Sequence, residues 1–174
     1  MISESLAMDI LLAFGLVVGL IIGARRRTVT QFFVLIGVIF AIIVASGFYR
    51  LMGNTLIQGL GEIGFPITWR SAYPFSFLAL TLAAYILAEA VIRAYMPGGA
   101  IRSLWVLDNL IGAGLGAMWA ALWLGVLVGT FQYVLAYQGA SLLPFIARLF
   151  RLLVLFVLRF FYPQGLPPIF DPLV

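Results

Sequence analysis

The most informative stretch of the sequence begins at Leu107-Asp108-Asn109-Leu110-Ile111-Gly112. Further small residues follow it, at Gly114, Gly116, Ala117, Ala120, Ala121, Gly125 and Gly129. No charged residue follows Asp108 until Arg148, so the stretch supplies the roughly 20 apolar residues that a spanning helix needs. Small residues let neighbouring backbones approach closely, which holds helices together in lipid. We therefore predict that residues 107–130 form the central helix of a small membrane bundle.

The composition predicts an all-α integral membrane protein. Of the 174 residues, 64% are hydrophobic and 9% are charged, whereas soluble domains carry about 25% charged residues. Three further apolar segments of spanning length cover residues 7–24, 29–48 and 75–95. The segment 29–48 is rich in Phe, Ile and Val, and we expect it to face lipid. We predict one membrane domain over residues 1–174, a bundle of four transmembrane helices plus two interfacial amphipathic helices.

The absence of two residue types restricts the chemistry. The chain has no Cys and no His, so disulfides and imidazole ligation of haem, chlorophyll or metal are not available. We predict no catalytic, metal-binding or cofactor-binding residues, while contact with lipid, quinone or carotenoid stays open. All ten basic residues are Arg and lie beside the apolar segments, which favours lipid headgroups over nucleic acid.

The first helix carries glycines at a spacing of four residues, which places them on one face. Such a ridge is typical of helix–helix contact in membranes. We predict that it packs against the small residues of the central helix. The predicted packing residues are Gly15, Gly19 and Gly23 on one side and Gly112, Gly116 and Ala120 on the other.

Three carboxylates fall inside apolar segments, at Asp9, Glu89 and Asp108. A carboxylate in a spanning helix is a functional candidate by default. Asp9 and Asp108 lie near helix starts, where a carboxylate also stabilises the helix dipole. Glu89 precedes Arg93 by four residues, the favourable order for an ion pair within a helix. We favour capping and ion pairing, with a proton or solute pathway as the alternative.

Two segments are predicted to lie in the membrane interface. Over residues 50–64, Asn54, Gln58 and Glu62 share one helical face and apolar residues the other. The run Gly59-Leu60-Gly61-Glu62-Ile63-Gly64 matches a dinucleotide-binding motif, but no strand precedes it, so we interpret its glycines as a helix stop.

The second interfacial segment is predicted over residues 142–162. Arg148, Arg151 and Arg159 lie within about 80° of one another on a helical wheel. We interpret this stripe as contact with lipid headgroups, and a fifth span as the alternative. The Pro-containing tail at residues 163–174 is predicted to be irregular.

The basic residues also predict an orientation. Arg25, Arg26 and Arg27 follow the first span directly, and short basic loops stay in the cytoplasm. We therefore predict a multi-pass membrane protein with its N-terminus outside, and these three Arg as headgroup contacts. The remaining Arg are divided between the two sides, so they leave the side of the tail open.

The two glycine helices resemble the colicin V production protein family of bacterial inner-membrane proteins. The resemblance rests on Asp108-Asn109-Leu110-Ile111-Gly112 and on Gly116-Ala117-Met118, with Asp9 and Gly23-Ala24-Arg25-Arg26 in the first helix. The family pattern has Arg-Gly where this chain has Ile22-Gly23 and Trp119-Ala120, and an Arg where it has Asn109. The resemblance implies the order of helices given above, a location in the bacterial inner membrane and a role in colicin V production, without an established chemistry.

Three classes of function follow from these features. The first is a non-catalytic scaffold or accessory subunit that binds other membrane proteins, for example in a respiratory or photosynthetic complex. The second is a helper or transporter for export of small solutes or toxins, with Asp9, Glu89 and Asp108 along the pathway. A membrane enzyme is disfavoured because no nucleophile–base pair can be proposed. We predict the first class, with the lipid bilayer and other membrane subunits as partners, no nucleic acid, and a homo-oligomer as the alternative assembly.

Overall fold

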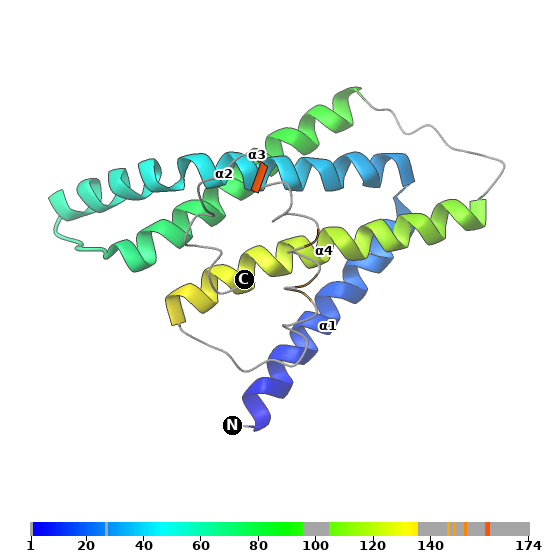
Figure 1. The fold of residues 1–174 in the computed structure, drawn as a ribbon, viewed down its shortest axis with the longest axis horizontal. Coiled ribbons are helices and arrows are strands. Elements are labelled where there is room, and N and C mark those ends of the chain that lie inside the picture. The colour runs from blue at the N-terminus through cyan, green and yellow to red at the C-terminus, as the bar shows by residue number, and fades with distance from the viewer. Residues whose placement is uncertain are drawn as a thin grey trace.

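The computed structural model of the chain describes residues 2–26, 28–95 and 105–135, together with residues 146, 148, 152, 159 and 160. These residues include four long α-helices and no strand: α1 (Ile2–Arg25), α2 (Thr28–Glu62), α3 (Trp69–Tyr95) and α4 (Trp105–Leu135) (Figure 1). Each helix contains a stretch that is long and apolar enough to cross a membrane. The all-α class is confirmed, and the four helices indicate a multi-pass membrane protein.

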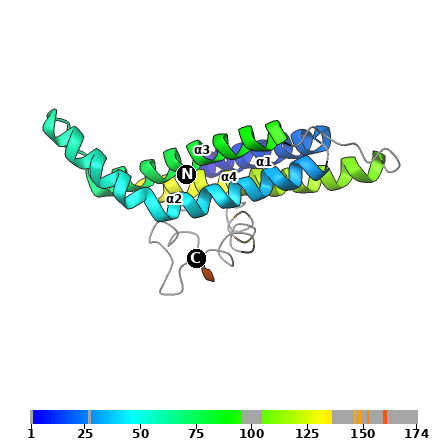
Figure 2. The same cartoon turned by 90° about the horizontal axis from the view of Figure 1, so that it is seen from above.

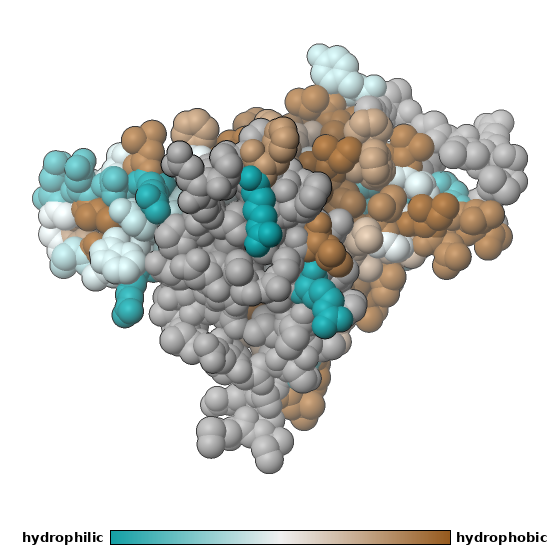
Figure 3. Space-filling view, viewed as in Figure 1, coloured by the Kyte–Doolittle hydropathy of each residue, from teal (hydrophilic) through white to brown (hydrophobic). Residues whose placement is uncertain are grey.

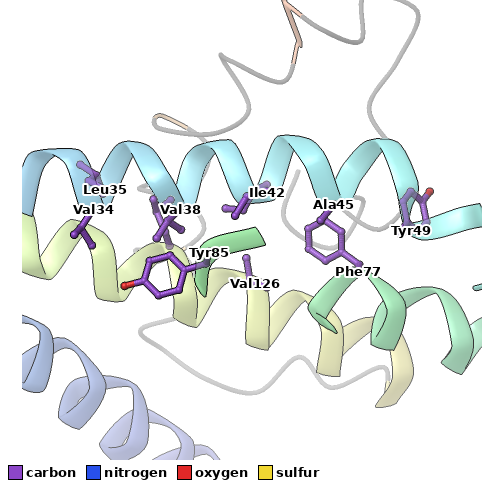
Figure 4. Packing of buried hydrophobic residues seen from close by; sticks show 11 residues of the cluster. Val34, Leu35, Val38, Ile42, Ala45, Tyr49, Phe77, Tyr85 and Val126 are labelled. Carbon is purple, nitrogen blue, oxygen red and sulfur yellow. The ribbon is translucent and has the colours of Figure 1, made fainter. Parts of the chain in front are cut away.

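The main core lies between α2, α3 and α4. One face of α2 is buried along most of its length, through Val34, Leu35, Val38, Ala41, Ile42, Ala45 and Tyr49. This face packs against Phe77 and Tyr85 of α3 and against Leu122 and Val126 of α4 (Figure 4). The expectation that residues 29–48 face lipid is therefore wrong for this face. The same Val, Ile and Ala side chains suit a lipid surface and a protein core, so composition alone could not separate the two.

Helix α1 packs mainly against α4, and α4 contacts each of the other three helices. The two helices run antiparallel, because Gly23 meets Gly112 while Gly15 meets Leu124 further along α4. The end of α1 lies beside the start of α2. Toward its N-terminus, α1 moves away from α2 and α3 (Figure 1). The position of α4 agrees with its expected role as the central helix.

Helix α2 is a single helix of 35 residues, and the prediction of a separate helix over residues 50–64 is wrong. Nothing at Tyr49 or Arg50 interrupts the backbone hydrogen bonds, since no Pro or helix-stopping turn occurs there. At 1.5 Å per residue the helix is about 52 Å long, well beyond a hydrocarbon core of about 30 Å. Its last turns extend beyond α1 and α4 (Figure 2). Asn54, Gln58 and Glu62 are exposed in this extension.

The glycine-rich run at residues 59–64 ends α2. Gly64 has a φ of 84°, a left-handed conformation that glycine adopts without steric cost. The Gly64 N–H donates to the Gly61 carbonyl at 3.1 Å, and the Phe65 N–H donates to the Leu60 carbonyl at 2.9 Å. These two bonds form a Schellman motif, which satisfies the last carbonyls of the helix. The run therefore acts as a helix stop in the structure.

Helix α3 begins at Trp69, earlier than the expected residue 75, and includes Pro74. The Thr68 carbonyl accepts hydrogen bonds from the N–H groups of Ser71 and Ala72 at 3.1 and 3.0 Å. A Pro near the start of a helix removes few backbone bonds, so the cap at Thr68 determines where the helix begins.

Hydrophilic and hydrophobic residues gather on different parts of the surface seen in Figure 3. Hydrophilic residues gather where α2 ends and α3 begins, and hydrophobic residues cover the start of α4. Most of the predicted interfacial helix at 142–162, and all of the tail at 163–174, lie outside the described residues. Arg148 and Arg159 are exposed, while Arg27 and Arg151 are not described.

Candidate functional site: the glycine seam and the polar junction

The contact between α1 and α4 is a seam of small residues, formed by Gly19 and Gly23 against Gly112, Gly116 and Ala120. A Cβ atom built on Gly23 would lie 2.6 Å from the Gly116 Cα and also overlap the Gly112 carbonyl oxygen. A Cβ atom built on Gly112 would lie 2.6 Å from the Gly23 carbonyl oxygen. The obstructing atoms belong to the backbone and cannot rotate away, so these positions have no room for a side chain. We call this contact the glycine seam.

The third glycine of the ridge has a different neighbour. A Cβ atom on Gly15 would lie 3.1 Å from the Leu124 side chain, which belongs to α4 one turn beyond Ala120. Because a leucine side chain is flexible, this position is less restricted than Gly19 or Gly23. The closest approach of the two backbones is thus at the Gly23 end of the seam.

Next to that end, polar side chains from all four helices meet. We call this group the polar junction: Arg26 after α1, Thr28 at the start of α2, Glu89 and Arg93 near the end of α3, and Asp108 near the start of α4. It lies on the right of Figure 1, where α1 ends and α2 begins. The sequence singled out Glu89, Arg93 and Asp108 individually, but gave no sign that they share one end of the bundle.

Asp108 links α4 to the first residue of α2. Its Oδ1 accepts a hydrogen bond from the Thr28 N–H at 3.1 Å, and its carbonyl accepts one from the Thr28 hydroxyl at 2.8 Å. The first N–H groups of a helix have no partner within the helix. Asp108 therefore caps α2 from a different helix, and its charge also suits the positive end of the α2 dipole.

Glu89 joins α3 to the end of α1. Its Oε1 accepts from Arg93 Nη2 at 2.6 Å and from Arg26 Nη2 at 3.1 Å. The Glu89 side chain is only 16% exposed, whereas that of Arg93 is 70% exposed. The pair with Arg93 lies within one helix and follows the spacing in the sequence. The pair with Arg26 joins residues that are 63 positions apart in the sequence. It was not expected, since Arg26 was predicted to contact headgroups.

An aromatic group lies next to the polar junction on the core side. The Tyr85 ring is 5.2 Å from the Trp123 ring and 6.4 Å from the Trp119 ring, measured between centroids. In Figure 4 the Tyr85 hydroxyl points along the bundle toward the end where α2 begins. The indole Nε1 atoms of Trp119 and Trp123 are buried and have no hydrogen-bond partner among the described residues.

Gln31 is the most unusual polar residue of the described part. Its side chain is fully buried, and neither its amide nitrogen nor its amide oxygen has a hydrogen-bond partner there. It precedes Val34 and Leu35 by one turn, so it continues the buried face of α2 toward the polar junction. A buried amide without partners costs free energy. Gln31 could not be singled out from the sequence, because a single Gln in an apolar run gives no periodic signal.

Asp9 does not join the other two carboxylates. It is partly buried near the start of α1, about 25 Å along the helix from Arg26 at 1.5 Å per residue. The described residues contain no group of three or more potential metal ligands. Of the predicted headgroup contacts, Arg25 is exposed at the end of α1, close to the polar junction.

These features define a class, a helical membrane bundle closed by a glycine seam and a polar junction. No protein-family model matches the chain, and neither a curated protein nor a solved structure matches it. Membership of the colicin V production family accordingly stays a prediction from the sequence.

Proposed function

We propose that the protein is a non-catalytic scaffold or accessory subunit that binds other membrane proteins in the bacterial inner membrane, as the resemblance to the colicin V production family suggests. In this proposal the N-terminus is outside, so the polar junction faces the cytoplasm. The exposed end of α2 then lies in the outer interface. No residue has a catalytic role.

The observation that carries the proposal is that α1 has two different faces, one packed against α4 and one exposed and apolar. One side is the glycine seam. The other side is an apolar stripe of exposed residues, Leu6, Ile10, Phe14, Val17 and Ile21. At 100° per residue the stripe is centred about 180° from Gly19. A helix that is fixed on one side and apolar on the other is suited to joining the bundle to a neighbouring helix.

The carboxylates support the same proposal. Asp108 caps α2 and Glu89 pairs with two Arg residues, so both have structural roles at the end of the bundle. Transport pathways place ionisable groups near the middle of the membrane, where they face a cavity. This arrangement favours an assembly role over a pathway.

Affinity purification from native membranes in mild detergent tests the proposal. Full-length chain is compared with the variant Ile10→Ala/Phe14→Ala, which truncates the α1 stripe. The matched control is Ile36→Ala/Phe40→Ala, which truncates two exposed residues at the same spacing on α2. We expect stoichiometric membrane partners with the wild type and the control, and their loss with the α1 variant. Recovery of the wild-type chain alone would contradict the proposal.

The second candidate is a helper or transporter for export, and Gln31 is the observation that favours it. A fully buried amide without a hydrogen-bond partner among the described residues is the kind of group that contacts a passing solute. Gln31→Leu keeps the volume and removes the amide. Loss of an export phenotype with normal accumulation of the protein would favour this candidate over the scaffold.

A further inference from the structure

Beside the polar junction, the outer surface of α3 carries a groove of about 280 Å³ lined by Ile86, Glu89, Ala90 and Arg93. This volume is just below the roughly 300 Å³ at which pockets for small-molecule ligands begin, so the groove fits one polar group of a larger molecule. It lies in the last three turns of α3, a helix long enough to span a membrane. At such a position a spanning helix leaves the hydrocarbon and meets lipid headgroups.

Glu89, which lines the groove, is paired with more positive charge than it balances. Arg26 and Arg93 share one Glu89 oxygen, so two guanidinium groups face one carboxylate. Arg26 Nη1 is buried and has no hydrogen-bond partner among the described residues. Arg93 is 70% exposed and therefore able to turn toward a ligand. The exposed Arg93 guanidinium, with the positive charge of Arg26 behind it, fits a phosphate oxygen, which guanidinium binds with good geometry.

The residues that line the groove form two rows along α3, one apolar and one charged. Ile86 and Ala90 are four residues apart and form an apolar row, with Ile86 56% exposed. Glu89 and Arg93 form a charged row beside it, displaced toward the end of the helix. A ligand that fits both rows has a negatively charged head and an apolar body.

We propose that this groove binds an anionic phospholipid, with the phosphate at Arg93 and the glycerol and first acyl carbons on Ile86 and Ala90. Glu89 holds the two Arg side chains in position and limits the net charge of the site to +1, which matches one phosphodiester. The site is independent of the proposed scaffold role, because it involves α3 and not the α1 stripe.

Native mass spectrometry of the full chain in detergent measures lipid binding directly. Phosphatidylglycerol is titrated against phosphatidylethanolamine, and inorganic phosphate is added in a separate series to separate a lipid site from a free phosphate site. Arg93→Gln removes the exposed guanidinium. Arg70→Gln is the matched control, an exposed Arg at the opposite end of the same helix.

We expect Arg93→Gln to weaken phosphatidylglycerol binding roughly fivefold, the effect of one basic side chain near a membrane surface. Arg70→Gln should leave this binding within twofold of the wild type. Equal losses in the two variants would show nonspecific attraction and overturn the proposal. Displacement of the lipid by inorganic phosphate alone, without preference for phosphatidylglycerol, would also overturn it.

A steric pair tests the groove without changing charge. Ala90→Leu fills the apolar row, and Ala83→Leu adds the same volume at an exposed position two turns earlier on α3. We expect only Ala90→Leu to reduce phosphatidylglycerol binding. Both variants are at exposed positions, so both should fold, and equal binding in the two would contradict a site at this groove.

Discussion

The geometry of the glycine seam predicts different effects for the same substitution at two glycines of α4 that are two residues apart. Gly116 and Gly114 lie in the same helix, yet only Gly116 is in contact with α1. A Cβ atom on Gly116 would lie 2.6 Å from the Gly23 Cα and 2.9 Å from the Gly23 nitrogen, whereas a Cβ atom on Gly114 meets nothing within 4 Å. Gly116→Ala and Gly114→Ala are therefore the same chemical change in two different environments.

The expected size of the effect follows from that geometry. In a helix interior, Ala is more favourable than Gly by up to about 1 kcal/mol, and this gain applies to both variants. In Gly116→Ala the two backbones must separate by about 1 Å to reach an ordinary carbon–carbon distance of roughly 3.6 Å. Overpacking of this kind costs about 1–3 kcal/mol. We expect Gly114→Ala to be at least as stable as the wild type and Gly116→Ala to be about 1–3 kcal/mol less stable than Gly114→Ala.

The difference in stability between the two variants is measured by unfolding them in mixed micelles, with Trp fluorescence as the signal. Trp119 and Trp123 lie on α4 close to the seam, so separation of α1 from α4 should change their signal. Gly19→Leu and Gly116→Leu add larger side chains to the same contact, and we expect loss of folded protein from both. If Gly116→Ala is stabilised as much as Gly114→Ala, the close approach of α1 and α4 is refuted.

Three further predictions concern α2. Asp108→Ala removes the cap from Thr28 and should destabilise the protein by about 1 kcal/mol, measured by the same unfolding assay; no change would show that another group caps the helix. Gly53→Ala should destabilise the contact with α3, because a Cβ atom there would lie 2.9 Å from Tyr73 Cε1. The matched Gly59→Ala meets nothing within 4 Å, and equal melting temperatures for the two would contradict this contact. Gln31→Leu should raise stability by about 1–3 kcal/mol by removing a buried amide without partners, and a lower stability would mean that the amide is satisfied in the membrane.

The number and class of the helices could be predicted from the sequence because they depend on local composition. Four apolar segments of sufficient length predict four helices wherever they occur. The glycine spacing at Gly15, Gly19 and Gly23 similarly marks a face that excludes side chains. Both features are properties of a single segment, so no knowledge of its neighbours is needed.

The arrangement of those helices required the structure. The buried face of α2 has the same Val, Ile and Ala residues that a lipid-facing helix would have, so its burial was not predicted. The continuous α2 was missed because Arg50 reads as an interface anchor, whereas a single charged side chain does not interrupt a helix. The link from Arg26 to Glu89 depends on α1 and α3 ending at the same side, which no local pattern records.

Labelling of single cysteines in intact cells tests the central claim most directly, because the natural chain contains no Cys. Tyr95→Cys places a thiol at the exposed end of α3, close to the polar junction, and Glu62→Cys places one at the exposed end of α2. A four-span bundle with its N-terminus outside predicts that a membrane-impermeant maleimide labels Glu62→Cys in intact cells. It also predicts labelling of Tyr95→Cys only after the membrane is permeabilised. Labelling of both positions in intact cells would contradict a membrane-spanning bundle, and the reverse pattern would contradict the proposed orientation.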